Sequence, residues 1–236
     1  MGVEKIEIIN RFTYADGKIF RNNKSYEQID ALVTFCIDPT ATLNESIVDI
    51  NLIPTDNDGK FRFTSDFSIV KPVSNNPGDE KILLELPNRG RRKVVDTFNR
   101  THEEPSHSPG PGDGFLFNHG FTVASIGWQW DVYHSDVLMG LESPNADLSG
   151  EKYRGKNVVE IRPNKTSNTW LLADRVHKPL KADLSDESAK LYVKNFEDDV
   201  DVLIPRSNWK FAKETKNNIV ESNEHIYLRG GFVKGK

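Results

Sequence analysis

Short apolar runs rich in β-branched and aromatic residues, bounded by clusters of Asn, Asp, Gly and Pro, constrain the fold of this chain more than any other feature. Such runs are typical of strands, and they lie at residues 5–9, 29–37, 47–53, 60–70, 81–86, 121–127, 158–161, 170–173, 190–193, 202–204 and 225–228. Before residue 60, Asn57, Asp58 and Gly59 supply the left-handed backbone that a hairpin turn requires. The sequence therefore predicts an antiparallel β meander over residues 1–72.

The pattern changes after the turn-forming stretch at residues 75–79. Residues 81–86 form a nearly continuous apolar run, which is typical of a strand covered on both faces. Helical spacing at 92–100, a short helix at 114–119 and a second buried strand at 121–127 complete a parallel β-α-β unit over residues 81–131. With a β-rich insertion at residues 132–236, the expected fold class is α/β, either as one domain or as the N-terminal part of a larger one.

The composition is that of an ordinary globular protein, with 236 residues, 28% of them charged, and a formal net charge of −4. No window approaches the roughly 20 apolar residues of a membrane helix, and no secretory signal is visible, so a cytoplasmic location without membrane contact is expected. A slightly acidic chain has no electrostatic attraction to nucleic acid.

The single cysteine, Cys36, excludes disulfides within the chain and multi-thiolate metal sites. It lies in an apolar β-branched run and is expected to be a buried strand residue. The histidines are scattered and lack the spacing of a zinc site. The sequence therefore predicts neither a metal nor a cofactor.

The segment Leu-Pro-Asn-Arg-Gly-Arg-Arg at residues 86–92 is the most informative motif, because it ends the first strand of the β-α-β unit. Ligands bind at the carboxyl ends of parallel strands, where peptide N–H groups are unpaired and helix N-termini follow. Gly90 permits the backbone to present an N–H group without an obstructing side chain. Asn88, Arg89 and Gly90 are therefore candidate site residues, and the alternative is a turn with a solvated basic surface.

A second motif, Gly-Trp-Gln-Trp-Asp at residues 127–131, ends the other strand of the unit. Trp128 and Trp130 lie on the same side of an extended chain, where they would line an apolar pocket or stack on a sugar ring; core packing is the alternative. Asp131 and His134 are close enough in sequence for an acid/base pair. The candidate substrate-binding residues are Trp128, Gln129, Trp130 and Asp131.

The sequence lacks a recognisable nucleophile. No Ser or Cys has glycines two places before and two places after it, so there is no Gly-x-Ser-x-Gly elbow. A Walker loop, a dinucleotide-binding Gly-x-Gly-x-x-Gly, a kinase signature and an EF-hand loop are also absent. Covalent catalysis by this chain alone is therefore not expected.

Taken in order, these motifs resemble the N-terminal half of a family catalogued as alpha/beta hydrolase domain-containing proteins. The Asn-Arg-Gly-Arg and Gly-Trp-Gln segments are the most specific parts of a resemblance that spans nearly the whole chain. It rests on residues 48–52, 61–72, 84–92, 114–116, 120–123, 127–131, 191–193, 204–205, 209 and 230–236.

In such proteins the chain continues into the central sheet and reaches the serine elbow, followed by the acid and the histidine. The resemblance therefore implies an esterase-type serine hydrolase that acts on a small ester-like or acyl substrate. Residues 88–90 would donate backbone N–H groups to a tetrahedral oxyanion. Because the elbow is absent, the chain is expected to be an N-terminal portion that is inactive alone.

Two other functions stay open. One is a non-catalytic β-sandwich that binds carbohydrate through Trp128 and Trp130, and the other is an interaction fragment without a small-molecule site. In a fragment, the buried strand at 121–127 would lack later neighbours in the sheet, so self-association through an exposed apolar sheet edge is expected.

Overall fold

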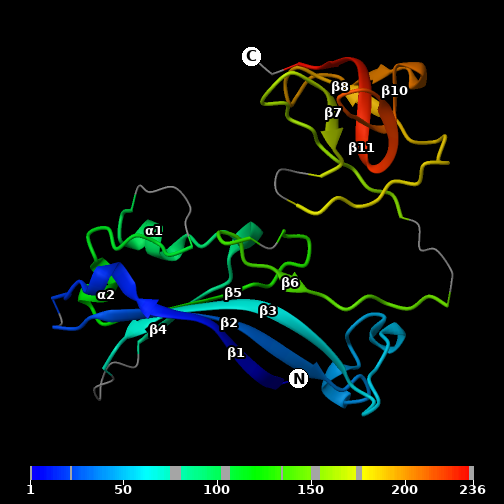
Figure 1. The fold of residues 1–236 in the computed structure, drawn as a ribbon. Helices are drawn as coiled ribbons and strands as arrows, with labels where there is room; N and C mark the ends of the chain where they lie inside the picture. Colours follow the sequence, from blue (N-terminus) through cyan, green and yellow to red (C-terminus); the bar gives the residue numbers. More distant parts are fainter. Residues whose placement is uncertain are drawn as a thin grey trace. The chain divides into compact units, whose positions relative to one another are not determined.

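The computed structural model describes residues 2–21, 23–74, 81–101, 107–133, 135–149, 155–173 and 177–233 (Figure 1). The chain divides into two compact units, residues 1–153 and residues 154–236. Of the residues described, 39% lie in strands and 12% in helices, and the strands form three separate sheets. The fold is therefore mostly β, and the expected α/β class is wrong.

The first unit is built on a mixed sheet with the strand order β1-β2-β3-β5-β4, and β6 pairs with β3 beside this path. Its strands are β1 (Gly2–Thr13), β2 (Tyr26–Ile37), β3 (Phe61–Pro72), β4 (Ile82–Glu85), β5 (Thr122–Ile126) and β6 (Leu141–Glu142). β1, β2 and β3 pair antiparallel in sequence order. β4 and β5 pair in parallel, as the β-α-β pattern predicts.

Two short helices connect β4 to β5, and their length explains why the fold is not α/β. α1 (Val94–Phe98) has five residues and α2 (Phe115–Asn118) has four. α1 ends at Phe98, and two residues later Arg100 has a left-handed φ of 52°, which a right-handed helix cannot contain. Figure 1 shows both helices on one side of the sheet.

An aromatic core fills the space between α2 and the sheet. Phe117 is completely buried, and its ring centroid lies 5.0 Å from that of Tyr14 and 4.9 Å from that of Tyr26. Both hydroxyls are satisfied: Tyr26 donates to the carbonyl of Phe117 at 3.0 Å and Tyr14 to that of Pro109 at 2.7 Å. These bonds hold Pro109 against Tyr14 and α2 against β2.

β4 is an edge strand rather than a strand covered on both faces. The side chains of Ile82 and Leu84 are 66% and 58% exposed, while Leu83 packs against the core. The strand expected to be the open edge, β5, instead lies between β3 and β4, and four of its five residues are buried. That expectation is wrong because the chain returns from the helices to the inner side of β4.

The run at residues 47–53 is not a strand. Between β2 and β3 the chain forms turns and the 3-10 helices η2 (Thr42–Asn44) and η3 (Ile50–Leu52). Ile50 and Ile53 pack with Ile37 and Phe61 and so cover one end of the sheet. The turn at Gly59 does form, with φ of 74°, inside this long connection.

The second unit has a three-stranded sheet in the order β10-β11-β7 and a separate pair, β8 with β9. Its strands are β7 (Ser167–Leu171), β8 (Leu191–Val193), β9 (Val202–Ile204), β10 (Trp209–Glu214) and β11 (Ile219–Phe232). Residues 158–161 are not a strand, and β10 was not expected from the sequence. Among the described residues of both units, no helix has the length and apolar character needed to span a membrane.

Candidate functional site

The loop after β4 is one tight turn, the 3-10 helix η4 (Asn88–Gly90). Arg89 and Gly90 have left-handed φ angles of 58° and 72°. Asn88 is exposed, Arg89 is half-buried and Gly90 is buried. A Cβ at Gly90 would lie 2.7 Å from Cγ1 of Val132 and 2.8 Å from the carbonyl oxygen of Met139, so close packing requires glycine here.

This loop contacts the segment after β5, which joins the two motifs found in the sequence. The backbone N–H of Arg89 donates to Oε1 of Gln129 at 2.5 Å, and Nη1 of Arg89 lies 3.5 Å from Oδ2 of Asp131. The indole N–H of Trp128 donates to the carbonyl of Pro87 at 3.0 Å. The structure thus places Arg89 beside Trp128, Gln129 and Asp131, at the carboxyl ends of two adjacent parallel strands.

The backbone N–H groups of Arg89 and Gly90 in η4, and that of Arg91 after it, donate within the protein. Besides the bond from Arg89 to Gln129, Gly90 donates to the carbonyl of Pro87 and Arg91 to that of Asn88, both at 3.3 Å. The N–H of Gly90 therefore does not point to solvent, and an oxyanion would meet the exposed Asn88 and the guanidinium of Arg89 first. The oxyanion role of the loop stays a prediction.

Trp128 and Trp130 are not core residues, since their side chains are 50% and 49% exposed. Their segment lies beyond the end of β5 and is not a strand, so strand alternation does not set their direction. Their half-exposed rings are accessible to a ligand beside the loop. His134, the expected acid/base partner of Asp131, lies outside the described residues.

A row of polar side chains, named here the polar row, crosses the sheet on the face that the helices cover. Asp30, Ser68, Ser125 and Glu85 are successive partners on β2, β3, β5 and β4. Ser68 donates to Oδ1 of Asp30 at 2.7 Å, and Ser125 donates to Oε2 of Glu85 at 3.1 Å. Asp30 and Glu85 interrupt the apolar runs of β2 and β4, which the sequence alone reveals. Only the strand register shows that the two carboxylates lie in one row across the sheet.

Glu85 also begins the first helix. Its Oε1 accepts hydrogen bonds from the backbone N–H groups of Lys93 at 2.5 Å and Val94 at 3.1 Å. These N–H groups lie at the N-terminus of α1 and have no partner within the helix. A carboxylate at this end is also favoured by the helix dipole. Glu85 therefore holds the connection after η4 against the sheet.

Arg92 lies over the polar row. Its guanidinium donates to Oγ of Ser68 at 3.1 Å and to the carbonyl of His107. Burial lowers the pKa of Arg92, and the carboxylates of Asp30 and Glu85 oppose this effect. An arginine starts from so high a value that its side chain stays charged at neutral pH.

The polar row does not have the geometry of a hydrolase triad. Nε2 of His107 lies 2.7 Å from Oδ2 of Asp30, but Ser68 bonds to Asp30 rather than to the histidine. A serine nucleophile needs its proton to go to the imidazole. The row instead anchors Arg92, the start of α1 and His107 to the sheet, and so positions the loop after β4.

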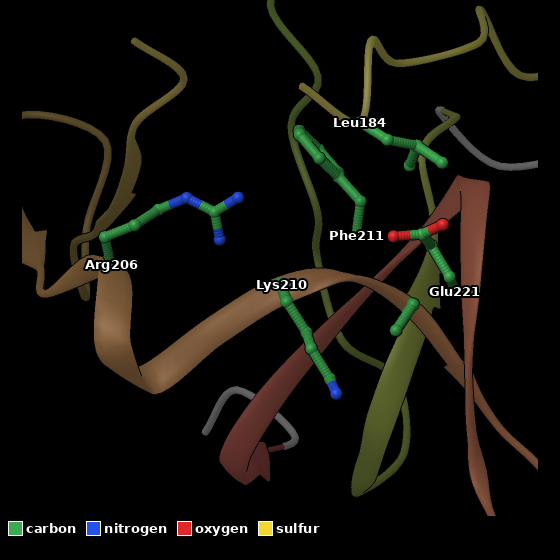
Figure 2. Close-up of a pocket in the computed structure, with 6 residues that line it drawn as sticks. Leu184, Arg206, Lys210, Phe211 and Glu221 are labelled. Carbon is green, nitrogen blue, oxygen red and sulfur yellow. The ribbon is translucent and has the colours of Figure 1, made fainter. Parts of the chain in front are cut away.

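The second unit has a small pocket, shown in Figure 2. Its volume is about 130 Å³, and its lining includes Leu184, Arg206, Phe211 and Glu221. The guanidinium of Arg206 lies 4.0 Å from the ring centroid of Trp209, and the side chain of Lys210 points away from the other labelled residues. Ligand sites usually enclose about 300–1,000 Å³, so this hollow is too small for a drug-sized molecule.

Among the residues that the structure describes, no three His, Cys, Asp or Glu side chains are grouped so that they could hold a metal ion. Cys36 is a free thiol on β2 and is half-buried. No protein-family model, curated protein or solved structure matches this chain. The resemblance to alpha/beta hydrolase domain-containing proteins therefore rests on the order of its motifs.

Proposed function

We propose that η4 and residues 128–131 form the substrate-binding part of an esterase-type serine-hydrolase site, with the nucleophile supplied from outside these 236 residues. One observation carries the proposal: the bond from Arg89 to Gln129 joins the loops that follow two adjacent parallel strands. Such loops form ligand sites in sheets with parallel strands. The order of the sequence motifs supports the same function.

The exposed groups fit a small ester with an apolar or aromatic part. Trp128 and Trp130 offer half-exposed rings to that part, while Asn88 and Arg89 offer donors to the oxygen that gains negative charge. Asp131 holds the guanidinium of Arg89 near the loop. The substrate proposed is thus a small molecule that meets the chain in the cytoplasm, and not a nucleic acid.

The proposal predicts binding without turnover by the purified chain. We expect a p-nitrophenyl phosphonate monoester, which resembles the anionic intermediate, to bind and to shift the indole N–H signals of the tryptophans in NMR spectra. Arg89→Ala should weaken this binding at least about tenfold, which is the loss of about 1.4 kcal/mol. Arg206→Ala, which removes an arginine from the second unit, is the control and should bind normally.

Two results would contradict this function. One is the absence of any shift at saturating phosphonate, or a shift that Arg89→Ala leaves unchanged. The other is stoichiometric serine labelling of the chain by a fluorophosphonate, which would place the nucleophile within this sequence. Hydrolysis of p-nitrophenyl acetate by the chain alone would have the same meaning.

A second candidate function is carbohydrate binding by Trp128 and Trp130, and their half-exposed side chains favour it. Sugar rings stack on exposed aromatic faces, and Arg89 and Asp131 lie nearby to bond hydroxyl groups. Saturable quenching of tryptophan fluorescence by oligosaccharides, lost in Trp130→Ala, would support this function. A flat titration across a glycan panel would exclude it.

A further inference from the structure

The face of the first sheet opposite the helices carries apolar side chains on all five strands of its main path. The strand register shows which residues lie on this face, because paired residues in neighbouring strands point to the same side of the sheet. One row is Ile8, Ala31, Phe67 and Ile126, and the next is Ile29, Ile69, Ala124 and Leu84. These two rows, with Ile82 beside them on β4, are named here the open face.

The open face does not have the composition of a surface in water. On the other face, Val70, Val123 and Leu83 pack in the aromatic core beside the polar row, so that face is already covered by the chain itself. An antiparallel sheet with one solvated face normally alternates apolar with polar residues. On the open face, Ile8 is 57% exposed and Ile82 is 66% exposed. Another surface is therefore needed to cover it.

Both ends of the open face are closed by the chain itself. At one end Ile37, Ile50 and Phe61 form a small buried cluster. At the other end Glu27 forms ion pairs with Arg11 at 2.7 Å and with Lys71 at 2.9 Å. These boundaries separate the apolar area from the rest of the surface.

The size of this area is close to that of a stable interface. Between its two ends the face takes about seven residues each from β1, β2 and β3, the five of β5 and the four of β4; at a rise of about 3.3 Å and a strand spacing of about 4.8 Å, this gives a flat area of about 475 Å². Two such faces would together bury about 950 Å² before the relief of the side chains is counted, which is close to the roughly 1,000 Å² expected of a specific interface.

We propose that the open face binds the open face of a second copy of this chain, so that the two sheets pack against each other in a symmetric dimer. Two sheets pack face to face about 10 Å apart when their side chains interdigitate. The rows alternate in size, with Ala31 between Ile8 and Phe67 and Ala124 between Ile69 and Leu84. The same surface therefore offers both the projections and the recesses that a two-fold contact needs.

The charges at the boundary are compatible with this contact. Glu27 lies between Arg11 and Lys71, so both signs are present in one cluster and the repulsion between copies is reduced. Dimerisation through the open face does not require the proposed hydrolase or carbohydrate site. It moves the expected self-association from a sheet edge to a sheet face.

The test is the mass of the purified chain by size-exclusion chromatography with light scattering, at concentrations up to about 100 μM. The expected mass is twice the 26.8 kDa of one chain. Ile8→Lys and Leu84→Lys place charges on two well-exposed positions of the open face, so each should weaken dimerisation at least about tenfold without unfolding the monomer. Leu43→Lys, at a position 91% exposed on η2, is the matched control and should remain a dimer.

A wild-type chain that stays monomeric over this range would overturn the proposal. A dimer that persists in the Ile8→Lys/Leu84→Lys double variant would also overturn it, since the contact would then lie at a sheet edge or in the second unit. If circular dichroism shows that the double variant has unfolded, the more exposed single variant Ile82→Lys takes its place. That variant must give the monomer mass for the inference to stand.

Discussion

The backbone N–H of Arg89 donates a hydrogen bond to the side-chain oxygen of Gln129 at 2.5 Å, across 40 residues of sequence. This bond joins the loop after β4 to the segment after β5. It keeps the guanidinium of Arg89 near Asp131 and beside the half-exposed tryptophans. Gln129 is therefore the residue through which the two sequence motifs act together.

Gln129→Leu should loosen this site. The substitution removes the acceptor for the N–H of Arg89, so we expect a loss of about 1–2 kcal/mol in the free energy of unfolding. Gln129→Glu keeps an acceptor oxygen and should lose less. Urea denaturation gives the free energies, and hydrogen exchange at the Arg89 amide shows whether the bond has opened. Equal stability of both variants with unchanged exchange would contradict the role given to Gln129.

Gly90→Ala should destabilise the protein much more than Gly59→Ala. Both glycines have left-handed φ angles, 72° and 74°, so both substitutions carry a similar backbone cost. A Cβ at Gly90 meets Val132 and the backbone of Met139, whereas nothing lies within 4 Å of a Cβ at Gly59. We expect Gly59→Ala to cost about 1 kcal/mol and Gly90→Ala about 2 kcal/mol more in denaturation experiments. Equal losses would mean that η4 can move away from Met139.

Parts of this fold follow from local patterns in the sequence, and parts do not. The strand at residues 202–204 and the parallel pairing of β4 with β5 agree with the patterns, because apolar runs and turn residues are local signals. The run at 47–53 has strand-like composition, yet it forms turns and a 3-10 helix from which Ile50 covers the end of the sheet. Tertiary packing decides such runs, since burial of Ile50 against Ile37 and Phe61 does not require a strand.

Local sequence patterns also failed to predict the fold class and which strand lies at the edge of the sheet. A run such as Ile82 to Leu86 is expected to be covered on both faces, but β4 ends the sheet and exposes Leu84. The helical spacing at 92–100 predicts a longer helix than the five residues of α1. Whether strands are interior or at an edge depends on their order in the sheet, which a single sequence does not contain.

The candidate site was likewise predicted only in part from the sequence. The sequence predicts that residues 88–90 and 128–131 matter, and the contacts between Arg89, Gln129 and Asp131 place them together. It does not predict the polar row, because the register of four strands aligns Glu85 with Asp30. Pairing across that distance has no local signal.

Glu85→Leu should be among the more damaging substitutions in the first unit. It removes the acceptor for the N–H groups of Lys93 and Val94, and it takes a compensating charge away from the buried Arg92. We expect a loss of about 3 kcal/mol by urea denaturation. Glu85→Gln retains one acceptor oxygen and should lose about half as much. If Glu85→Leu unfolds at the same urea concentration as the wild type, the polar row does not hold α1 to the sheet.

Glu27 should make the protein less stable in acid. Its hydrogen bond from Arg11, together with the ion pair with Lys71, holds the pKa of Glu27 below its ordinary value of 4.5, although burial opposes this. Because the folded-state pKa is the lower one, the stabilisation is fully present above pH 4.5 and is lost as the pH falls through the folded-state pKa. We therefore expect the free energy of unfolding of the wild type to exceed that of Glu27→Gln by about 1–2 kcal/mol at pH 7, and this difference should vanish in stronger acid.

Urea denaturation at a series of pH values measures this difference, and Glu45→Gln, which removes an exposed carboxylate elsewhere, is the control. A difference that stays constant down to pH values below the NMR titration of Glu27 would show that the carboxylate acts through packing and not through its charge.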